Sequence, residues 1–255
     1  MFKELYNYRE LLKTNVKKEI RGKYKGSALG VLWSFVNPLL SVLVYAIVFP
    51  FILRDTQPNY VTFLIIGILP WTWFITSISA GTNCIWINGG IIKKVYFPRE
   101  ILPISVVTAG LINFLISCII ILMFVLISGI GIGASIIALP FVMLIQYILQ
   151  LGILFVTCAI DVYIRDAEYI IGFFVSLLFY GTPVLYSATL FPEKYRWILN
   201  LNPLTTIINS YRDIFYNKVF PNFMTLGTIF LVSLAILIIG YMIFKKLERR
   251  FAEEV

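Results

Sequence analysis

Long apolar runs alternate with short polar segments along this chain. Six runs carry no Asp, Glu, Lys or Arg, and they cover residues 31–53, 61–87, 104–128, 136–160, 169–192 and 223–244. Each run exceeds the roughly 20 residues that a helix needs to cross the hydrocarbon core of a bilayer. A soluble protein rarely buries six helices of this length. The pattern therefore predicts an all-α, polytopic membrane protein with six transmembrane helices.

The residues before the first run show helical periodicity. Between residues 3 and 25, apolar side chains recur every three or four residues, and a basic flank recurs beside them. This arrangement is typical of a helix that lies on anionic headgroups. We therefore expect a cytoplasmic amphipathic interface helix in a first unit, residues 1–30, that either only anchors the topology or also guides an anionic, lipid-linked substrate. The stripe is Leu5, Tyr8, Leu12, Val16, Ile20 and Tyr24, and the flank is Lys13, Lys17, Arg21 and Lys25.

The segment between the fifth and sixth predicted spans is broken by Pro, Gly and Asn. Gly181-Thr182-Pro183 interrupts an apolar run, and the pieces that follow are short and half apolar. Irregular backbone at membrane depth is tolerated only where protein or a wet cavity satisfies it. We therefore expect re-entrant helices that border a passage, with an ordinary outer loop as the alternative.

A few polar or flexible residues stand out inside and between the runs. Gln146 and Gln150 lie one helical turn apart and share a face, where hydrogen bonding between helices is favoured over substrate binding. Gly129, Gly131 and Gly133 predict a tight turn. They do not indicate a phosphate-binding loop, because no strand precedes them and no Lys follows.

Composition and charge support a membrane location. The chain has 255 residues, of which 60% are hydrophobic and 13% are charged, whereas soluble domains carry about 25% charged residues. Its net charge of +8 comes from basic residues beside the runs. The segments on the side of the termini carry 16 Lys and Arg and the opposite segments carry 5. The positive-inside rule therefore places both termini in the cytoplasm.

The sequence lacks the chemistry of an enzyme or of an ion-coupled transporter. It contains no His and no nucleotide-binding G-x-x-x-x-G-K-[ST] motif, and we expect no catalytic residues and no metal site. The apolar runs also lack the charged residues that carry protons or sodium ions through transporters. If the chain moves a substrate uphill, the energy must therefore come from ATP hydrolysis on a separate subunit.

Two charged connectors on the predicted cytoplasmic side are candidates for contacting such a subunit. The first, Lys93-Lys94-Val95-Tyr96-Phe97-Pro98-Arg99-Glu100-Ile101-Leu102-Pro103, combines charges, aromatic rings and two prolines in a short stretch. Prolines stiffen a segment, and aromatic and Arg side chains are typical anchors of protein interfaces. The second connector contains Arg165 and Asp166, which also fit local capping and anchoring on the inner side.

The chain resembles the membrane permeases of type-2 ATP-binding-cassette (ABC) exporters that move O-antigen, capsule or teichoic-acid polymers. The resemblance covers nearly the whole length, and it rests on the order and spacing of several motifs. These are residues 21–33 leading into Asn37-Pro38-Leu39, Ile66-Gly67-Ile68-Leu69-Pro70-Trp71, residues 93–103, Tyr163-Ile164-Arg165-Asp166, Thr182-Pro183-Val184-Leu185-Tyr186, Asn202-Pro203-Leu204 and Tyr211-Arg212-Asp213.

The resemblance implies roles for two groups of residues. Residues 88–100 look like the coupling helix that sits in a groove of the ATPase, and the outer pieces look like helices that shape the channel exit. The expected ATPase-coupling residues are Lys93, Lys94, Tyr96, Phe97, Pro98, Arg99, Glu100, Arg165 and Asp166. The expected outer re-entrant region contains Pro183, Tyr186, Asn202, Pro203, Tyr211, Arg212 and Asp213.

A substrate entrance and a path are further hypotheses. Basic residues just before the first span are placed to meet the pyrophosphate of a lipid-linked glycan, and these are Arg21, Lys23 and Lys25. Sugar faces stack on aromatic rings, so Tyr45, Trp71, Trp73 and Phe74 are candidates for the path. The same four rings fit an aromatic belt at the membrane interface equally well.

The resemblance also implies an assembly and a location. We expect residues 31–255 to form a single six-span type-2 ABC transmembrane domain, and two copies of the chain to join two ABC ATPase subunits that bind ATP and Mg²⁺. The complex would move lipid-linked polysaccharide across a bacterial inner or plasma membrane, and nucleic acid is not an expected partner. Export of a small lipid or drug is the alternative within the family, and a non-transporting membrane scaffold is the alternative outside it.

Overall fold

The computed structural model describes residues 6–22, 30–53 and 58–255. Within these residues every regular element is helical and no strand occurs, which confirms the all-α class. Four helices are long and apolar enough to cross a membrane, and each contains most of one predicted run. They are α4 (Tyr60–Thr82), α7 (Ile101–Ile127), α8 (Leu139–Tyr163) and α12 (Phe223–Leu247). The two other runs correspond to α3 (Trp33–Leu53) and α9 (Ala167–Tyr180), whose described apolar segments are shorter.

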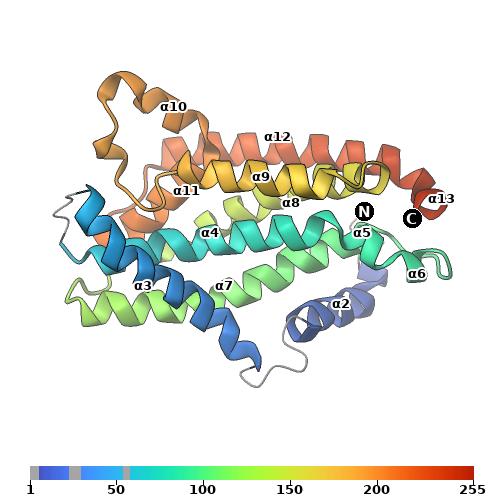
Figure 1. Cartoon of the computed structure of the whole chain (residues 1–255), viewed down its shortest axis with the longest axis horizontal. Coiled ribbons are helices and arrows are strands. Elements are labelled where there is room, and N and C mark those ends of the chain that lie inside the picture. The colour runs from blue at the N-terminus through green and yellow to red at the C-terminus, as the bar shows by residue number, and fades with distance from the viewer. Residues whose placement is uncertain (1–5, 23–29, 54–57) are drawn as a thin grey trace.

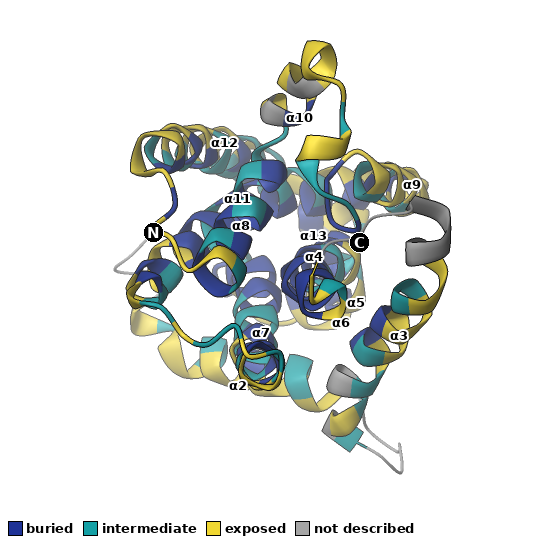
Figure 2. Cartoon of the chain, turned by 90° about the vertical axis from the view of Figure 1, so that its left-hand side faces the viewer, coloured by how far each residue is buried: buried dark blue, intermediate teal, exposed yellow. Residues whose placement is uncertain are grey.

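The long helices form a bundle around α4 and α8 (Figures 1 and 2). Viewed along the bundle, α4 and α8 are mostly buried, whereas α3, α9 and α12 carry exposed faces on the outside. Those exposed faces are apolar, as expected for helices that meet lipid tails or another apolar chain. Helices α4 and α8 therefore form the core of the bundle.

The connectors gather at two opposite ends of the bundle. Both termini lie at one end, together with the short helices α5 (Cys84–Ile87) and α6 (Gly89–Ile92), and we call it the terminal end (Figure 1). The other end, the far end, is closed by hydrogen bonds between segments distant in sequence. There the Tyr60 hydroxyl donates to the Leu185 carbonyl at 2.8 Å, and the Ser135 hydroxyl donates to the Ile214 carbonyl at 3.1 Å.

The predicted glycine turn lies at the far end, between α7 and α8. Gly129 and Gly131 have φ values of 72° and 77°. These values belong to the left-handed region, where residues with a Cβ atom are strained. The turn prediction is confirmed, and Gly129 and Gly131 are required by backbone conformation, whereas Gly133 has an ordinary φ of −97°.

Glycines also allow α8 and α12 to cross closely. A Cβ atom added to Gly240 would overlap the Gly152 carbonyl oxygen, and one added to Gly152 would lie 2.6 Å from the Leu237 nitrogen. Small residues at such crossings let helix backbones approach each other in membranes.

Replacing Gly240 with alanine is therefore expected to separate α8 and α12 and to destabilise the chain by about 1–3 kcal/mol, as overpacking does. Gly227 lies in the same helix, and a Cβ atom added there would have no neighbour within 4 Å, so Gly227→Ala is the matched control. Because alanine is the better helix former, the control should be neutral or slightly stabilising. Thermal unfolding in detergent measures both variants, and equal midpoints would contradict the close crossing.

The amphipathic helix α2 (Arg9–Gly22) packs along α7 on the half nearer to the termini (Figure 1). Its apolar stripe faces protein: Tyr8 and Leu12 pack against the core, and Val16 is buried. The basic flank, in contrast, is exposed at Lys13 and Lys17. A helix therefore forms within the predicted range, and Leu5, Tyr24 and Lys25 of the predicted faces lie outside the described residues. Its described apolar stripe packs against α7 and the core, although we expected it to face lipid. A location at the membrane interface stays a prediction.

The broken segment consists of short helices. The helix α9 ends at Tyr180, earlier than the apolar run, and a turn over residues 182–187 follows the capping residue Gly181. The Asn202 side chain then caps α11, because its Oδ1 accepts from the Leu204 amide at 3.0 Å while Pro203 occupies the first helical turn. The pieces are η3 (Ala188–Leu190), η4 (Glu193–Tyr195), α10 (Arg196–Leu201), α11 (Pro203–Arg212) and the π-helical turn η5 (Asp213–Asn217).

Candidate functional site

The first connector is a short exposed turn at the terminal end. It follows α6 and precedes α7, and only residues up to Ile92 are helical, although a coupling helix was expected over 88–100. Lys93 and Lys94 are exposed, and the Tyr96 side chain is 86% exposed. Phe97, in contrast, is 6% exposed and belongs to the apolar core. Tyr96 is therefore the ring available to a partner, and Phe97 together with buried Pro98 anchors the turn to its own chain.

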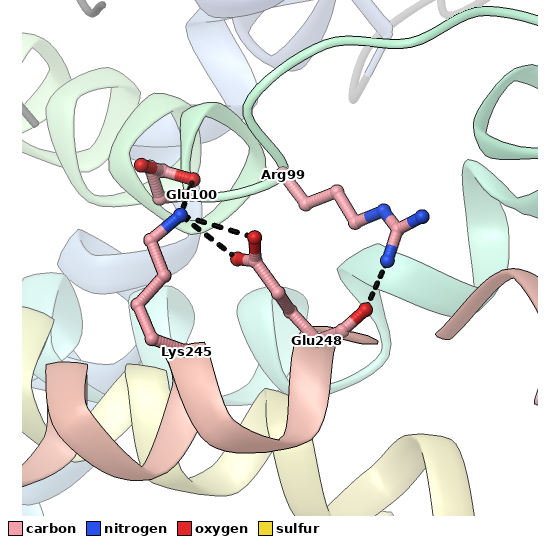
Figure 3. A network of polar contacts seen from close by, with 4 residues as sticks. All are labelled: Arg99, Glu100, Lys245 and Glu248. Carbon is pink, nitrogen blue, oxygen red and sulfur yellow. Dashed lines mark hydrogen bonds and ion pairs between the residues drawn. The ribbon is translucent and has the colours of Figure 1, made fainter. Parts of the chain in front are cut away.

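An ionic network attaches this connector to the end of α12 (Figure 3). Lys245 donates to the Glu100 carboxylate at 3.0 Å and to the Glu248 carboxylate at 3.0 Å, while Arg99 donates to the Glu248 carbonyl. Glu100 is 0% exposed, so its charge depends on this partner. A cavity of about 270 Å³ lies between the connector and this end of α12, lined by Tyr96, Arg99 and Glu248 among others. The connector is thus held rigidly and presents an open pocket beside Tyr96.

The second connector lies at the same end. The Arg165 guanidinium is 4.2 Å from the centre of the Trp86 ring, and the Asn83 amide donates to Glu168 at 3.0 Å. Both contacts join the second connector to the segment that precedes the first. Asp166 is exposed and occupies the residue before α9, without a side-chain capping bond. The structure therefore places the second connector against the segment that leads into the first.

The four candidate path aromatics are less accessible than expected. Trp71, Trp73 and Phe74 are buried, and Tyr45 is half-buried. The Trp71 ring lies 5.4 Å from Phe74 and 5.4 Å from Phe179, so it is part of a packed ring cluster. Trp73 borders a cavity of about 340 Å³ and stacks on a neighbouring ring. Within this single chain, Trp73 is the one of the four that borders a described cavity, and the path stays a prediction.

The candidate entrance is described in part. Arg21 is exposed near the end of α2, whereas Lys23 and Lys25 lie outside the described residues. A neighbouring basic residue, Lys18, donates to the Asn88 side chain at 2.7 Å. This bond ties α2 to the segment between α5 and α6. A role in substrate entry therefore stays a prediction for all three residues.

At the far end, Arg212 holds the turn that follows α9. Its side chain is 4% exposed, and its guanidinium donates to the carbonyls of Pro183 at 2.6 Å, Val184 at 2.6 Å and Tyr186 at 3.4 Å. The guanidinium also lies 3.7 Å from the centre of the Phe63 ring on α4. Five fixed donors suit Arg to this task, since it satisfies several carbonyls at once.

Neighbouring contacts fix α11 against the central helices. The Tyr211 hydroxyl donates to Gln146 at 2.9 Å, and the Gln146 amide donates to the Pro70 carbonyl at 2.9 Å. Gln146 therefore joins α8 to both α11 and α4, which confirms its predicted role between helices. Asn202 donates to the Thr182 hydroxyl at 2.8 Å, so the start of α11 is also tied to the turn.

Sequence reasoning missed several residues of these two sites. In the sequence, Lys245 is one more basic residue near the terminus, and Glu248 does not stand out. Phe63 looks like any apolar residue of its run. A charge pair separated by 145 residues leaves no local signal, and a ring under a guanidinium leaves none either.

Comparison with known proteins adds independent findings. The family model of the ABC-2 type transporter matches residues 10–216. A Myxococcus xanthus protein named O-antigen export system permease protein RfbA is 37% identical over 261 residues, which cover 100% of this chain and 99% of that protein. Two Klebsiella pneumoniae proteins of the same name are each 35% identical over 245 residues, covering 96% of this chain and 94% of theirs. The similarity includes both connectors and the broken segment.

Proposed function

Because this chain belongs to the ABC-2 type transporter family, we propose that it is the membrane permease of an ATP-driven exporter of lipid-linked polysaccharide. It is a multi-pass membrane protein, and a permease of this kind implies a separate ATPase partner. The observation that carries the proposal is similarity over the full length to O-antigen export permeases. Nothing comparable favours a small-lipid or drug exporter, or a membrane scaffold.

The proposed arrangement places the terminal end in the cytoplasm of a bacterial cell, at its inner or plasma membrane. The charge asymmetry of the sequence supports this orientation. In this arrangement α3 and α9 complete six spans, and the pieces from η3 to α11 are the re-entrant helices. Two copies of the chain join two ABC ATPase subunits, which hold ATP and Mg²⁺. The polymer is an O-antigen or a related capsule or teichoic-acid chain.

The connectors are the proposed docking site of the ATPase. The first connector offers Tyr96, Lys93 and Lys94 outward, while the network of Glu100 and Lys245 behind it resists deformation. A force on the first connector is therefore transmitted to α7, which directly follows it, and to α12, to which Glu100 is bonded. Arg165, stacked on Trp86, makes the second connector move with the first.

Tyr96→Ala is expected to weaken binding of the ATPase at least tenfold, since truncation of a central aromatic anchor costs about 2 kcal/mol or more. The fold should not change, because the ring is 86% exposed. Copurification of the ATPase with the permease measures the effect. Tyr195→Ala, at an exposed tyrosine of the outer segment, is the matched control and should leave copurification unchanged. If the ATPase copurified with Tyr96→Ala as well as with the wild type, the ring would be excluded as an anchor.

The function itself is tested with inverted membrane vesicles that contain the permease and its ATPase. We expect lipid-linked glycan to become protected inside the vesicles only when ATP is supplied. Protection without ATP, or ATP-driven uptake of a small lipid or drug with no uptake of glycan, would contradict the proposal. Replacing Arg21, Lys23 and Lys25 with Gln should reduce glycan uptake and leave assembly intact if these residues meet the pyrophosphate.

A further inference from the structure

A polar cavity of about 540 Å³ opens at the far end of the bundle. It lies between the start of α4, the segment 187–189 and the junction of α11 with η5. Its volume falls in the range of about 300–1,000 Å³ that is typical of small-molecule sites. The far end is the proposed outer face, so this cavity lies on the side to which a polymer would emerge.

One wall of the cavity is rigid and aromatic. The Phe63 ring contacts the Arg212 guanidinium, 3.7 Å from its centre, and the Tyr216 ring, which meets it in an edge-to-face arrangement with the two centres 5.8 Å apart. The Tyr216 hydroxyl donates to the Pro58 carbonyl. These contacts fix the rings before any ligand arrives, which lowers the entropic cost of binding.

The facing wall carries polar donors and acceptors. Asn209, Asp213 and Asn217 come from three successive turns of α11 and η5, and the Asn217 amide donates to Asp213 at 3.0 Å. Thr189 lines the opposite side of the cavity. Burial raises the pKa of Asp213 above its usual value, and the bond from Asn217 offsets part of that rise. Amide, carboxylate and hydroxyl groups next to aromatic rings suit a ligand that is rich in hydroxyl groups.

The charges of the cavity argue against two other ligand classes. Among its described lining residues, Asp213 is the only carboxylate, and the described chain holds no cluster of three or more potential metal ligands. A divalent cation prefers more oxygen charge than this. Arg212 is 4% exposed and both its Nη groups already donate to backbone carbonyls, so its guanidinium is not presented to the cavity as an open fork for a phosphate. Its charge balances that of Asp213 and leaves the described wall neutral overall.

We propose that this cavity binds uncharged sugar units of the exported glycan as they leave the permease. The identity of the ligand rests on the proposed function, whereas its neutral, hydroxyl-rich character follows from the residues that line the cavity. Asn209, Asp213 and Asn217 hydrogen-bond the sugar hydroxyls, and the Tyr216 ring, held in place by Phe63, covers an apolar sugar face. The site selects sugar units at the exit and is separate from the connectors that meet the ATPase.

The test is saturation-transfer NMR of the purified permease–ATPase complex in nanodiscs, with maltose, mannobiose and chitobiose as probes. At least one disaccharide should receive saturation from the protein. Asp213→Asn and Thr189→Val, which alter opposite sides of the cavity, should each reduce that transfer at least threefold. Glu193→Gln removes a carboxylate from the same outer segment outside the described lining, so it should leave the transfer unchanged.

Several outcomes would overturn the proposal. They are no transfer to any disaccharide, equal transfer in the wild type and both cavity variants, or binding of inorganic phosphate in place of sugar. The yield of the assembled complex shows whether each variant folds. Asp213 and Thr189 belong to different elements, so the two variants test the cavity independently. The vesicle experiment separates this proposal from the proposed function. ATP-driven glycan uptake without disaccharide binding removes only the exit site, whereas the absence of glycan uptake removes the exporter assignment.

Discussion

Arg212→Met is expected to destabilise the chain more than any other single substitution at the far end. The carbonyls of Pro183, Val184 and Tyr186 lose their shared donor, and methionine offers none. Each buried carbonyl left without a donor costs about 1–3 kcal/mol. Methionine keeps most of the side-chain volume, so the loss comes from the missing hydrogen bonds and from the lost contact between the guanidinium and the Phe63 ring. The turn 182–187 should detach from α4 and α11.

The unfolding midpoint measures this loss directly. Cys84, Cys118 and Cys158 are all buried, so a thiol-reactive dye reports unfolding. Each kcal/mol lost should lower the midpoint by about 2–4 °C. Arg212→Lys should fall between the wild type and Arg212→Met, because a single ammonium nitrogen cannot reach all the carbonyls that the guanidinium contacts with two separate nitrogens. Lys194→Met, at an exposed lysine of the outer segment, is the control. An Arg212→Met variant as stable as this control would show that the carbonyls find other donors.

Lys245→Met is expected to cause the largest loss at the terminal end. It leaves the Glu100 carboxylate, which is 0% exposed, without its cation. Removing one partner of a buried pair typically costs about 3–5 kcal/mol. The first connector should then separate from α12, and binding of the ATPase should weaken together with stability. Lys246→Met removes the neighbouring lysine, which is outside the network, and should change neither quantity.

A second substitution shows whether the pair itself is responsible. Glu100→Gln removes the buried charge, so Lys245→Met/Glu100→Gln should recover part of the stability lost by Lys245→Met alone. A double-mutant cycle on the unfolding midpoints gives the coupling free energy. Coupling close to zero would mean that Glu248, also 3.0 Å from Lys245, is the partner that matters.

The long helices could be predicted from the sequence because a long uncharged run in a bilayer has no alternative to the helix. The runs 61–87 and 104–128 lie largely within α4 and α7. Local chemistry was also readable: Asn202-Pro203 begins a helix, and Gly129 and Gly131 make a turn. Each of these signals comes from residues close together in the chain.

The rest could not be predicted because the decisive partners are distant or are backbone atoms. Hydropathy continues through Gly181, yet the helix ends there and Arg212 holds the turn beyond it. Phe97 and Glu100 of the first connector were expected to contact the ATPase, but Phe97 turns into the core and Glu100 pairs with Lys245. The first outcome depends on how α11 approaches the turn after α9, and the second on how α12 approaches the first connector. No short sequence pattern encodes either approach.

The length of α9 has a consequence for the surrounding bilayer. Its 14 residues extend about 21 Å at 1.5 Å per residue, about 9 Å less than a hydrocarbon core of roughly 30 Å. A short apolar wall is accommodated by thinning of the membrane or by polar material that reaches deeper. In the proposed six-span arrangement, headgroups and water beside α9 would therefore approach the midplane more closely than beside α12, which has 25 residues. The hydrocarbon layer that a polar molecule must cross would then be thinner beside α9 than beside α12.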